Sequence, residues 1–135
     1  MATPIAVETK KHTEAVNITS EIEQQLPADF NGGCLVFCRH TTAGLTINEN
    51  ADPDVTRDLS SDLERLVPWD NSRFNHMEGN SAAHVKSSLL GVSLTVPVEN
   101  GRLVLGTWQS IYFYEFDGPR SRNVVIQLLT GEPGK

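Results

Sequence analysis

The sequence predicts an α+β fold, with residues 1–135 forming one domain around a mixed, largely antiparallel β-sandwich-like sheet with two to three helices packed on it. Three observations support this class. Segments with strand-like alternation outnumber those with helical spacing, and tight turns join several of them. The length allows one sizeable core, and 39% hydrophobic with 21% charged residues is typical of a globular protein.

The first part of the chain is predicted to contain two strands joined by a short helix. Patches of alternation in residues 5–18 indicate an opening strand. Ser20 and Glu23 fit a capping box, which would start a helix that Pro27 limits to about two turns. Residues 31–33, Asn-Gly-Gly, are typical of a turn. Residues 34–40 come next and are apolar on both faces, which predicts a strand inside the sheet.

The clearest helix begins at Asp52, a residue that accepts free amides, with Pro53 at the first helical position. It is expected to end before Pro68 and to pack on the sheet through an apolar stripe at helical spacing: Val55, Leu59, Leu63 and Leu66. A polar loop follows, and residues 80–90 predict a third helix.

The last part of the chain is predicted to be β-structure. Asn100 and Gly101 form the strongest two-residue hairpin signal of the chain. A second turn is expected at residues 117–120, where Gly118 and Pro119 adjoin. The strands connected by these turns are predicted at 92–98, 103–105, 108–116 and 123–129.

Composition limits the partners and the compartment. The net charge of −6 leaves no basic field for a polyphosphate backbone, so nucleic acid is not expected as a partner. No apolar segment has the length of a signal peptide or a membrane span, which predicts a cytoplasmic protein without membrane contact. Cys34 and Cys38 share a strand face about 13 Å apart, too far for a disulfide, and are expected to be buried thiols.

His40 is the most informative histidine, because a buried strand delivers it to the rim of the sheet beside the hydroxyls of Thr41 and Thr42. It is either a site residue or a histidine at the core edge bonded to a backbone carbonyl. Glu49 and Asn50 precede the helix that starts at Asp52, where backbone amides favour an anion. These two side chains serve either a site or the cap.

Asn80 and His84, with Ser87 or Ser88, share one face of the predicted third helix. This polar face either meets water or lines a site. His76, in the loop before the helix, would make a metal set with His84 and the distant His40, although no HExxH motif is present.

Trp108 and Gln109 would suit a planar heterocycle, because an indole offers a flat wall and an amide both donates and accepts. The alternative is a tryptophan packed in a core or a subunit interface. Arg120 could direct its donors at a phosphate or carboxylate, or at the nearby Glu115.

Four segments, at 40–55, 76–84, 106–109 and 115–120, together resemble the YjbQ-like family, and the resemblance extends from about residue 5 to about residue 129. Arg39 stands where members of that family often have proline. The resemblance implies a homotrimer and a site that can include residues of neighbouring subunits. It also implies a secondary thiamine-phosphate synthase activity, which joins hydroxymethylpyrimidine diphosphate to thiazole phosphate and releases pyrophosphate.

On this interpretation the site needs positive groups for the departing diphosphate, a flat wall for the pyrimidine and a group for proton transfer. A divalent cation, Mg²⁺ or Zn²⁺, would assist at the small phosphorylated substrate, with His40, His76 and His84 as its ligands. Two alternatives stay open: a metal-dependent hydrolase or phosphatase that uses the same histidines, and a non-catalytic binder of a small anionic metabolite. The expected catalytic residues are His84, His40, Glu49 and Asn50, and the expected substrate contacts are Thr41, Thr42, Asn80, Trp108, Gln109 and Arg120.

Overall fold

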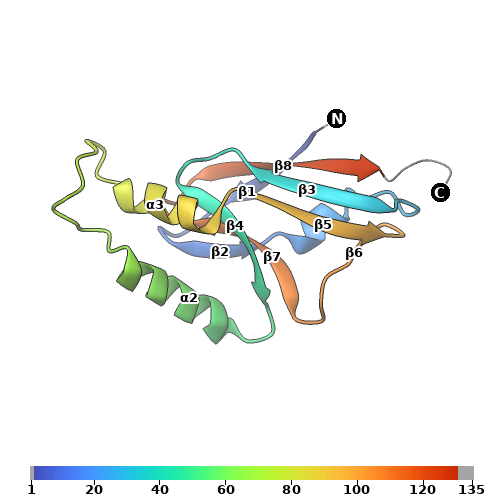
Figure 1. The fold of residues 1–135 in the computed structure, drawn as a ribbon, viewed down its shortest axis with the longest axis horizontal. Helices are drawn as coiled ribbons and strands as arrows, with labels where there is room; N and C mark the ends of the chain where they lie inside the picture. The colour runs from blue at the N-terminus through green and yellow to red at the C-terminus, as the bar shows by residue number, and fades with distance from the viewer. Residues whose placement is uncertain (1, 131–135) are drawn as a thin grey trace.

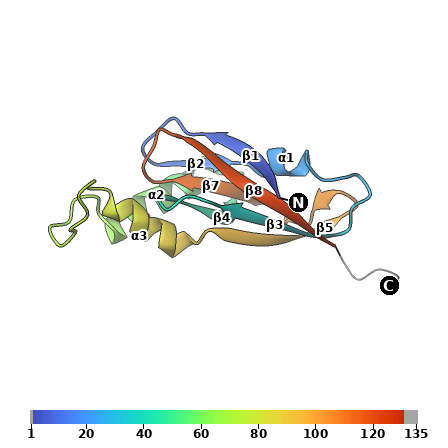
Figure 2. The ribbon, with the colours of Figure 1, turned by 90° about the horizontal axis from the view of Figure 1, so that it is seen from above.

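The computed structural model describes residues 2–130 and contains two β-sheets that pack face to face (Figures 1 and 2). Every strand pair in this range is antiparallel, and the predicted α+β sandwich is confirmed. The larger sheet has the order β1 (Thr3–Glu8), β8 (Ser121–Thr130), β3 (Gly32–Cys38), β5 (Ser93–Glu99) and β6 (Arg102–Leu103). The smaller sheet has the order β2 (Glu14–Asn17), β7 (Gln109–Glu115) and β4 (Ala43–Glu49).

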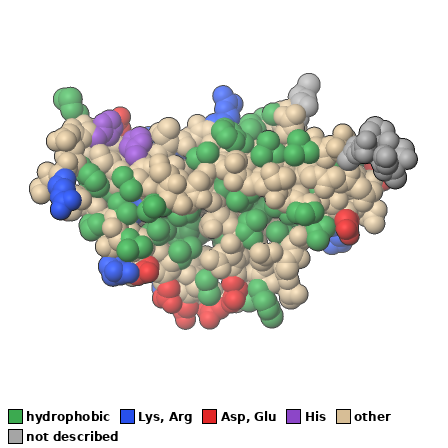
Figure 3. Space-filling view, viewed as in Figure 1, with side chains coloured by type: hydrophobic (Ala, Val, Ile, Leu, Met, Phe, Trp, Pro, Cys, Tyr) green, Lys and Arg blue, Asp and Glu red, His purple; other side chains and the backbone are tan. Residues whose placement is uncertain are grey.

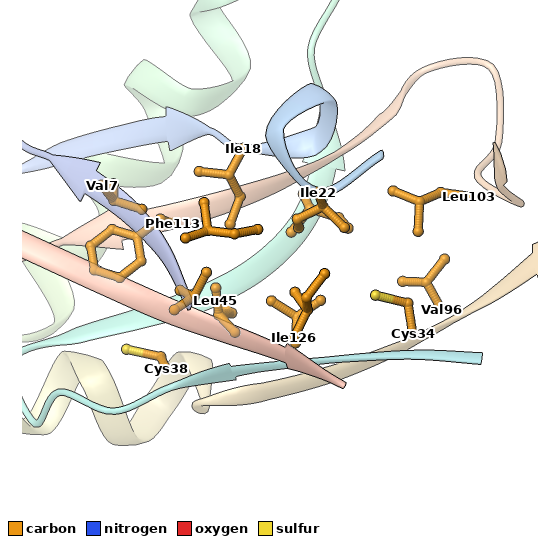
Figure 4. Close-up of a cluster of buried hydrophobic side chains, with 14 of the residues drawn as sticks. Val7, Ile18, Ile22, Cys34, Cys38, Leu45, Val96, Leu103, Phe113 and Ile126 are labelled. Carbon is orange, nitrogen blue, oxygen red and sulfur yellow. The ribbon is translucent and has the colours of Figure 1, made fainter. Parts of the chain in front are cut away.

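The core lies between the sheets and is made of side chains that alternate along the strands (Figure 4). Strand β3 lies between β8 and β5, so the prediction of an interior strand is correct. Its inward side chains include Cys34 and Cys38, which are buried free thiols as expected. Burial raises the pKa of Cys34 to about 11.

Three helices accompany the sheets in the described range: α1 (Thr19–Glu23), α2 (Pro53–Leu66) and α3 (Ser81–Leu90). The Asp52 carboxylate accepts a hydrogen bond from the Asp54 amide at 2.9 Å, as expected of the cap of α2. Leu63 of α2 is buried against Tyr114 of β7, but Leu66 is 60% exposed. The predicted apolar stripe therefore covers the sheet only in part.

Helix α3 packs closely on β4 because both elements present small residues at the contact. Ala82 and Ala83 are fully buried, and the Ser87 hydroxyl donates to the Ala43 carbonyl at 2.6 Å. A side chain at Gly44 would place its Cβ only 2.9 Å from the backbone oxygen of Gly91, so only glycine permits this approach.

Two details of the first part of the chain differ from the prediction. The expected strand at 5–18 is two strands, which belong to different sheets and are separated by residues 9–13. The predicted capping box is wrong, because Ser20 lies inside α1 and Ile18 is the N-cap. Asn17 supplies the side-chain acceptor at the helix start instead. Its Oδ1 accepts hydrogen bonds from the Thr19 amide at 3.0 Å and from the Thr19 hydroxyl at 2.7 Å.

Strand β4 is not predicted from the sequence, whereas the hairpin between β5 and β6 is confirmed. Asn100 and Gly101 have φ values of 49° and 74°, which a tight two-residue hairpin turn requires. Strand β4 instead pairs along its whole length with β7, about 60 residues later in the sequence. It carries the chain away from His40 and ends at Glu49, which determines where the candidate site residues lie.

Candidate functional site

A groove lies between the segment that follows β3 and helix α3. We call it the histidine groove. It has a volume of about 470 Å³, and its lining includes both His40 and His84. The lining also includes Thr41, Ser87, Ser88 and Val92.

A second hollow adjoins the histidine groove and shares His40, Thr41 and Val92 with it. Phe37 contributes an apolar wall to this hollow, and Arg39 contributes a cation. The two hollows together offer hydroxyl, imidazole and guanidinium groups beside a flat apolar surface. Such a combination suits a small ligand with an aromatic ring and an anionic group.

His40 accepts a hydrogen bond from the backbone; the expected alternative, a bond to a backbone carbonyl, is not what its Nε2 makes. Its Nε2 accepts a hydrogen bond from the backbone N–H of Asn123 at 3.0 Å. Burial and the nearby Arg122 guanidinium lower the pKa of His40 below its ordinary value. His40 is therefore a partly buried, neutral imidazole at neutral pH.

A buried ion pair lies behind His40 and was not predicted. Arg122 is 7% exposed and Glu115 is 0% exposed, and the guanidinium donates to both carboxylate oxygens, with 2.8 Å between Nε and Oε1. The Thr9 hydroxyl and the Asp117 amide donate to the same carboxylate at 2.8 and 2.9 Å. Burial alone would raise the pKa of Glu115, but these hydrogen bonds hold it below its ordinary value.

The ion pair also fixes Thr42, because Arg122 Nη2 donates to the Thr42 hydroxyl oxygen at 2.8 Å. Thr42 is only 7% exposed, so it supports the groove from behind, whereas its neighbour Thr41 lines the groove. The alternation of β8 indicates that the side chain of Arg122 is buried. It occupies an inward position in register with Val124 and Ile126, where an arginine needs a buried partner.

The loop before α3 brings further predicted residues close to the groove, and Figure 3 shows histidine side chains gathered at this end of the molecule. The rings of His76 and His84 are 5.4 Å apart between centroids, and His76 Nε2 is 3.8 Å from a Glu78 carboxylate oxygen. Asn80 donates to Asp117 at 2.9 Å, and its Oδ1 is buried without a partner among the described residues.

Arg120 belongs to the same end of the chain but contacts Asp117 rather than Glu115. Its Nε donates to the Asp117 carbonyl at 2.8 Å and its Nη2 to the carboxylate at 3.0 Å. No three His, Cys, Asp or Glu side chains within residues 2–130 are arranged to hold a metal ion. The expected set of three histidine ligands is therefore not assembled in this conformation.

The remaining predicted residues lie at the opposite end of β4. Glu49 pairs with Gln109 across β4 and β7, and the Asn50 side chain donates to the Ser110 hydroxyl at 2.7 Å. Trp108, whose carbonyl accepts from the Asn50 amide, is 61% exposed. Because β4 has seven residues, this cluster lies about 20 Å from Thr42. One chain thus carries two separate clusters. The histidine cluster comprises His40, His76 and His84, and the tryptophan cluster comprises Glu49, Asn50, Trp108 and Gln109.

In the described range, 2–130, the helices are too short or too polar to cross a membrane.

Comparison with known proteins agrees with the fold and the motifs. The family described as "UPF0047 protein YjbQ-like" matches residues 3–131. The UPF0047 protein YugU of Bacillus subtilis is 50% identical over 131 residues, which are 96% of this chain and 99% of that protein. The UPF0047 protein YjbQ of Escherichia coli O157:H7 is 43% identical over 122 residues, or 85% of this chain and 87% of that protein.

Solved structures show the same architecture. A YjbQ/UPF0047 family protein from Clostridium acetobutylicum, called uncharacterized and conserved, superposes with a TM-score of 0.89 at 45% identity. A conserved hypothetical protein from Thermus thermophilus superposes with a TM-score of 0.90, also at 45% identity. Each comparison covers 94% of this chain and 99% of the other. Sequence and structure thus agree that the chain belongs to the UPF0047 family of YjbQ-like proteins.

Proposed function

We propose that the chain binds a small phosphorylated metabolite in the histidine groove and acts there as a transferase in the cytoplasm. The proposed secondary reaction joins hydroxymethylpyrimidine diphosphate to thiazole phosphate and yields thiamine phosphate and pyrophosphate. The observation that supports it best is the composition of the groove, where His40, Thr41 and His84 lie beside the hollow that contains Arg39. The resemblance of four sequence segments to the YjbQ-like family supplies the reaction.

In this reaction the bond between the pyrimidine methylene and the diphosphate oxygen breaks, and the electron pair leaves with pyrophosphate. The thiazole nitrogen then forms the new bond to the methylene carbon. Positive and hydrogen-bonding groups stabilise the departing oxygen. We assign acid or base catalysis to His84, because α3 fixes its direction and an imidazole can donate or accept a proton.

A divalent cation, Mg²⁺ or Zn²⁺, fits the proposal in terms of donor chemistry. The imidazoles of His76 and His84 are 5.4 Å apart between centroids, and His76 Nε2 is 3.8 Å from a Glu78 carboxylate oxygen. Zn²⁺ accepts both kinds of donor, but within residues 2–130 these groups would have to move closer together to hold the ion. When bound, the cation would neutralise charge on the phosphates.

The tryptophan cluster enters the proposal through a homotrimer in which a neighbouring subunit supplies Trp108 to the histidine cluster. The separation of about 20 Å within one chain supports this, since Trp108 cannot reach His84 of its own chain. In a cyclic trimer each site would then combine the histidine cluster of one subunit with the tryptophan cluster of the next.

Mixed trimers test this arrangement. His84→Ala and Trp108→Ala chains, each inactive alone, are coexpressed with different tags, and trimers that carry both tags are purified. Every mixed trimer has one interface with intact His84 facing intact Trp108, so about a third of the wild-type activity should return. Mixed trimers that stay inactive would show that the two clusters do not share a site.

The reaction itself is tested with hydroxymethylpyrimidine diphosphate and thiazole phosphate, with and without Mg²⁺, and thiamine phosphate is measured by chromatography after oxidation to its fluorescent product. His84→Ala should form no product while keeping the circular dichroism spectrum and the oligomer size. His12→Ala is the matched control, because His12 is exposed and does not line the groove. Full activity of His84→Ala would remove His84 from the chemistry.

A second candidate, a metal-dependent phosphatase, is supported by the contacts of His76, whose ring is 5.4 Å from that of His84 and whose Nε2 is 3.8 Å from a Glu78 carboxylate oxygen. It predicts copurified metal and release of phosphate from simple phosphate esters. Absence of bound metal, together with no response to added Zn²⁺ or Mn²⁺, would count against it. Tight binding of the phosphorylated ligands without turnover under every metal condition would instead identify a non-catalytic binder.

A further inference from the structure

The bond at His40 Nε2 replaces a missing contact of the β-ladder. The last paired residue of β3 is Cys38, opposite Val124 of β8. Beyond this pair β3 ends, and the next N–H of β8, that of Asn123, meets the imidazole of His40 at 3.0 Å. Because a backbone N–H can only donate, Nε2 must be unprotonated. The proton of the neutral ring therefore resides on Nδ1.

His40 Nδ1 belongs to a ring that lines the histidine groove. No hydrogen bond from Nδ1 to another group occurs among residues 2–130. The buried side-chain atoms without a partner in that range are those of Asn80 and Asn123, so Nδ1 is not sealed inside the protein. The ring lines both the groove and the adjoining hollow. The free end of the ring is thus an N–H donor that a ligand can reach.

The charges around the ring favour its neutral form. Arg122 of β8 and Arg39 of the same segment oppose a positive charge, whereas Glu115 of β7 partly offsets them. His84 of α3 shares the groove, and the thiol of Cys38 donates to the His40 carbonyl at 3.9 Å. Arg122 directly precedes Asn123, whose N–H binds His40 Nε2, and its bonds to Glu115 and to the Thr42 hydroxyl hold the guanidinium at the segment that carries His40.

We propose that His40 is a neutral, fixed Nδ1–H donor for a phosphoryl oxygen of the ligand, and that Arg122 is a positioning residue that keeps it so. His40 then neither takes up a proton nor ligates a metal in the groove, and these roles are left to His84 and its neighbours. The inference rests on the proposed phosphate ligand, but the state of the ring can be measured without any reaction.

Nuclear magnetic resonance of the ¹⁵N-labelled full chain tests the state of the ring. Long-range ¹H–¹⁵N correlation distinguishes the two nitrogens, and His40→Gln assigns the signals by their loss. We expect a protonated Nδ1 and an unprotonated Nε2 at pH 7.5, with the neutral ring persisting below the ordinary pKa of a histidine. A proton on Nε2, or an imidazolium at pH 7.5, would overturn the proposal. The tautomer itself is measured on the wild-type chain, and His40→Gln serves only to assign the signals.

Inorganic phosphate tests the donor role. Titration should shift the Nδ1–H signal, and His40→Leu should weaken phosphate binding at least tenfold. His40→Gln retains an N–H donor and should bind phosphate within about threefold of the wild type. Unchanged binding by His40→Leu would refute the donor role, even if thiamine phosphate is formed. Confirmed binding without thiamine phosphate would instead refute only the proposed reaction.

The positioning role of Arg122 has a readout of its own. Arg122→Gln removes the charge that opposes protonation, so the pKa of His40 measured by the same titration should rise. Thr42→Val is the control, because it removes a bond of Arg122 but leaves the ion pair with Glu115. If Arg122→Gln does not fold, Arg122→Lys keeps the charge and should leave the pKa nearly unchanged while the ring tautomer persists. A pKa that is the same in wild type and Arg122→Gln, or a changed tautomer in Arg122→Lys, would remove Arg122 from this role.

Discussion

Glu115→Gln should be one of the most destabilising single changes that preserves the shape of a side chain in this protein. The carboxylate is 0% exposed and accepts hydrogen bonds from Arg122, the Thr9 hydroxyl and the Asp117 amide. Glutamine turns one acceptor oxygen into an NH₂ group that faces donors, and it leaves the guanidinium without a counter-charge. Breaking a buried pair on one side costs about 3–5 kcal/mol.

The loss is measured by urea unfolding at pH 7.5 and one protein concentration, followed by circular dichroism. With an m-value of about 2 kcal/mol per molar urea, the midpoint should fall by about 1.5–2.5 M. A double substitution, Glu115→Leu with Arg122→Met, should be less destabilised than either single change, because no unpaired charge stays buried. The exposed pair of Asp54 and Arg57 is the control, and Asp54→Asn should cost less than about 1 kcal/mol.

A loss below about 1 kcal/mol for Glu115→Gln would refute the reasoning, because it would mean that water reaches the carboxylate in solution. A double variant that is as unstable as the sum of the two singles would contradict the coupling of the two charges.

Three further predictions concern other parts of the fold. Asp52→Ala should lower the free energy of unfolding by about 0.5–2 kcal/mol in the same urea assay, because the Asp54 amide loses its acceptor, and no loss would show that the cap is unimportant. Gly44→Ala should destabilise by about 1–3 kcal/mol, since its Cβ would lie 2.9 Å from the Gly91 oxygen, and a neutral effect would mean that α3 shifts without cost. The free energy of unfolding should decrease as the pH falls below about 6.5, because His40 has a lowered pKa in the folded chain and binds a proton more readily in the unfolded chain. His40→Gln should flatten this part of the pH profile, and an unchanged profile would contradict the lowered pKa.

Local chemistry made parts of the fold predictable from the sequence. The Asn100 and Gly101 turn and the Asp52 cap each depend on a few neighbouring residues, and both appear in the structure as predicted. The capping box at Ser20 fails for a related reason. The upstream Asn17 competes for the same helix start and takes the Thr19 amide first.

Long-range pairing made other parts unpredictable. Strand β4 alternates apolar Ala43, Leu45 and Ile47 with Gly44, Thr46 and Asn48, but the segment is short and follows the polar residues 39–42, so it does not stand out as a strand. Its partner β7 is distant in the sequence, and their register places Glu49 beside Gln109 rather than near His40. The composition of the two clusters could thus be predicted from motifs, but their separation depends on a pairing that the local pattern does not encode.

The resemblance to the YjbQ-like family places His40 and His84 in one site, and in the structure both residues line the histidine groove. The ion pair of Glu115 and Arg122 joins β7 and β8, which belong to different sheets, so the local pattern does not show that the two residues meet. An arginine at an inward position of an otherwise apolar strand is a signal that periodicity analysis can detect.

The reactivity of the two thiols between the sheets reports how often the fold opens. Cys34 is 0% exposed and Cys38 is 2% exposed, and Figure 4 shows both side chains within the core. With a pKa of about 11, roughly one Cys34 in ten thousand is a thiolate at pH 7. A disulfide reagent can therefore react with Cys34 only when the sheets separate. The rate of this reaction measures how often the sheets separate in an unlabelled, unmodified chain.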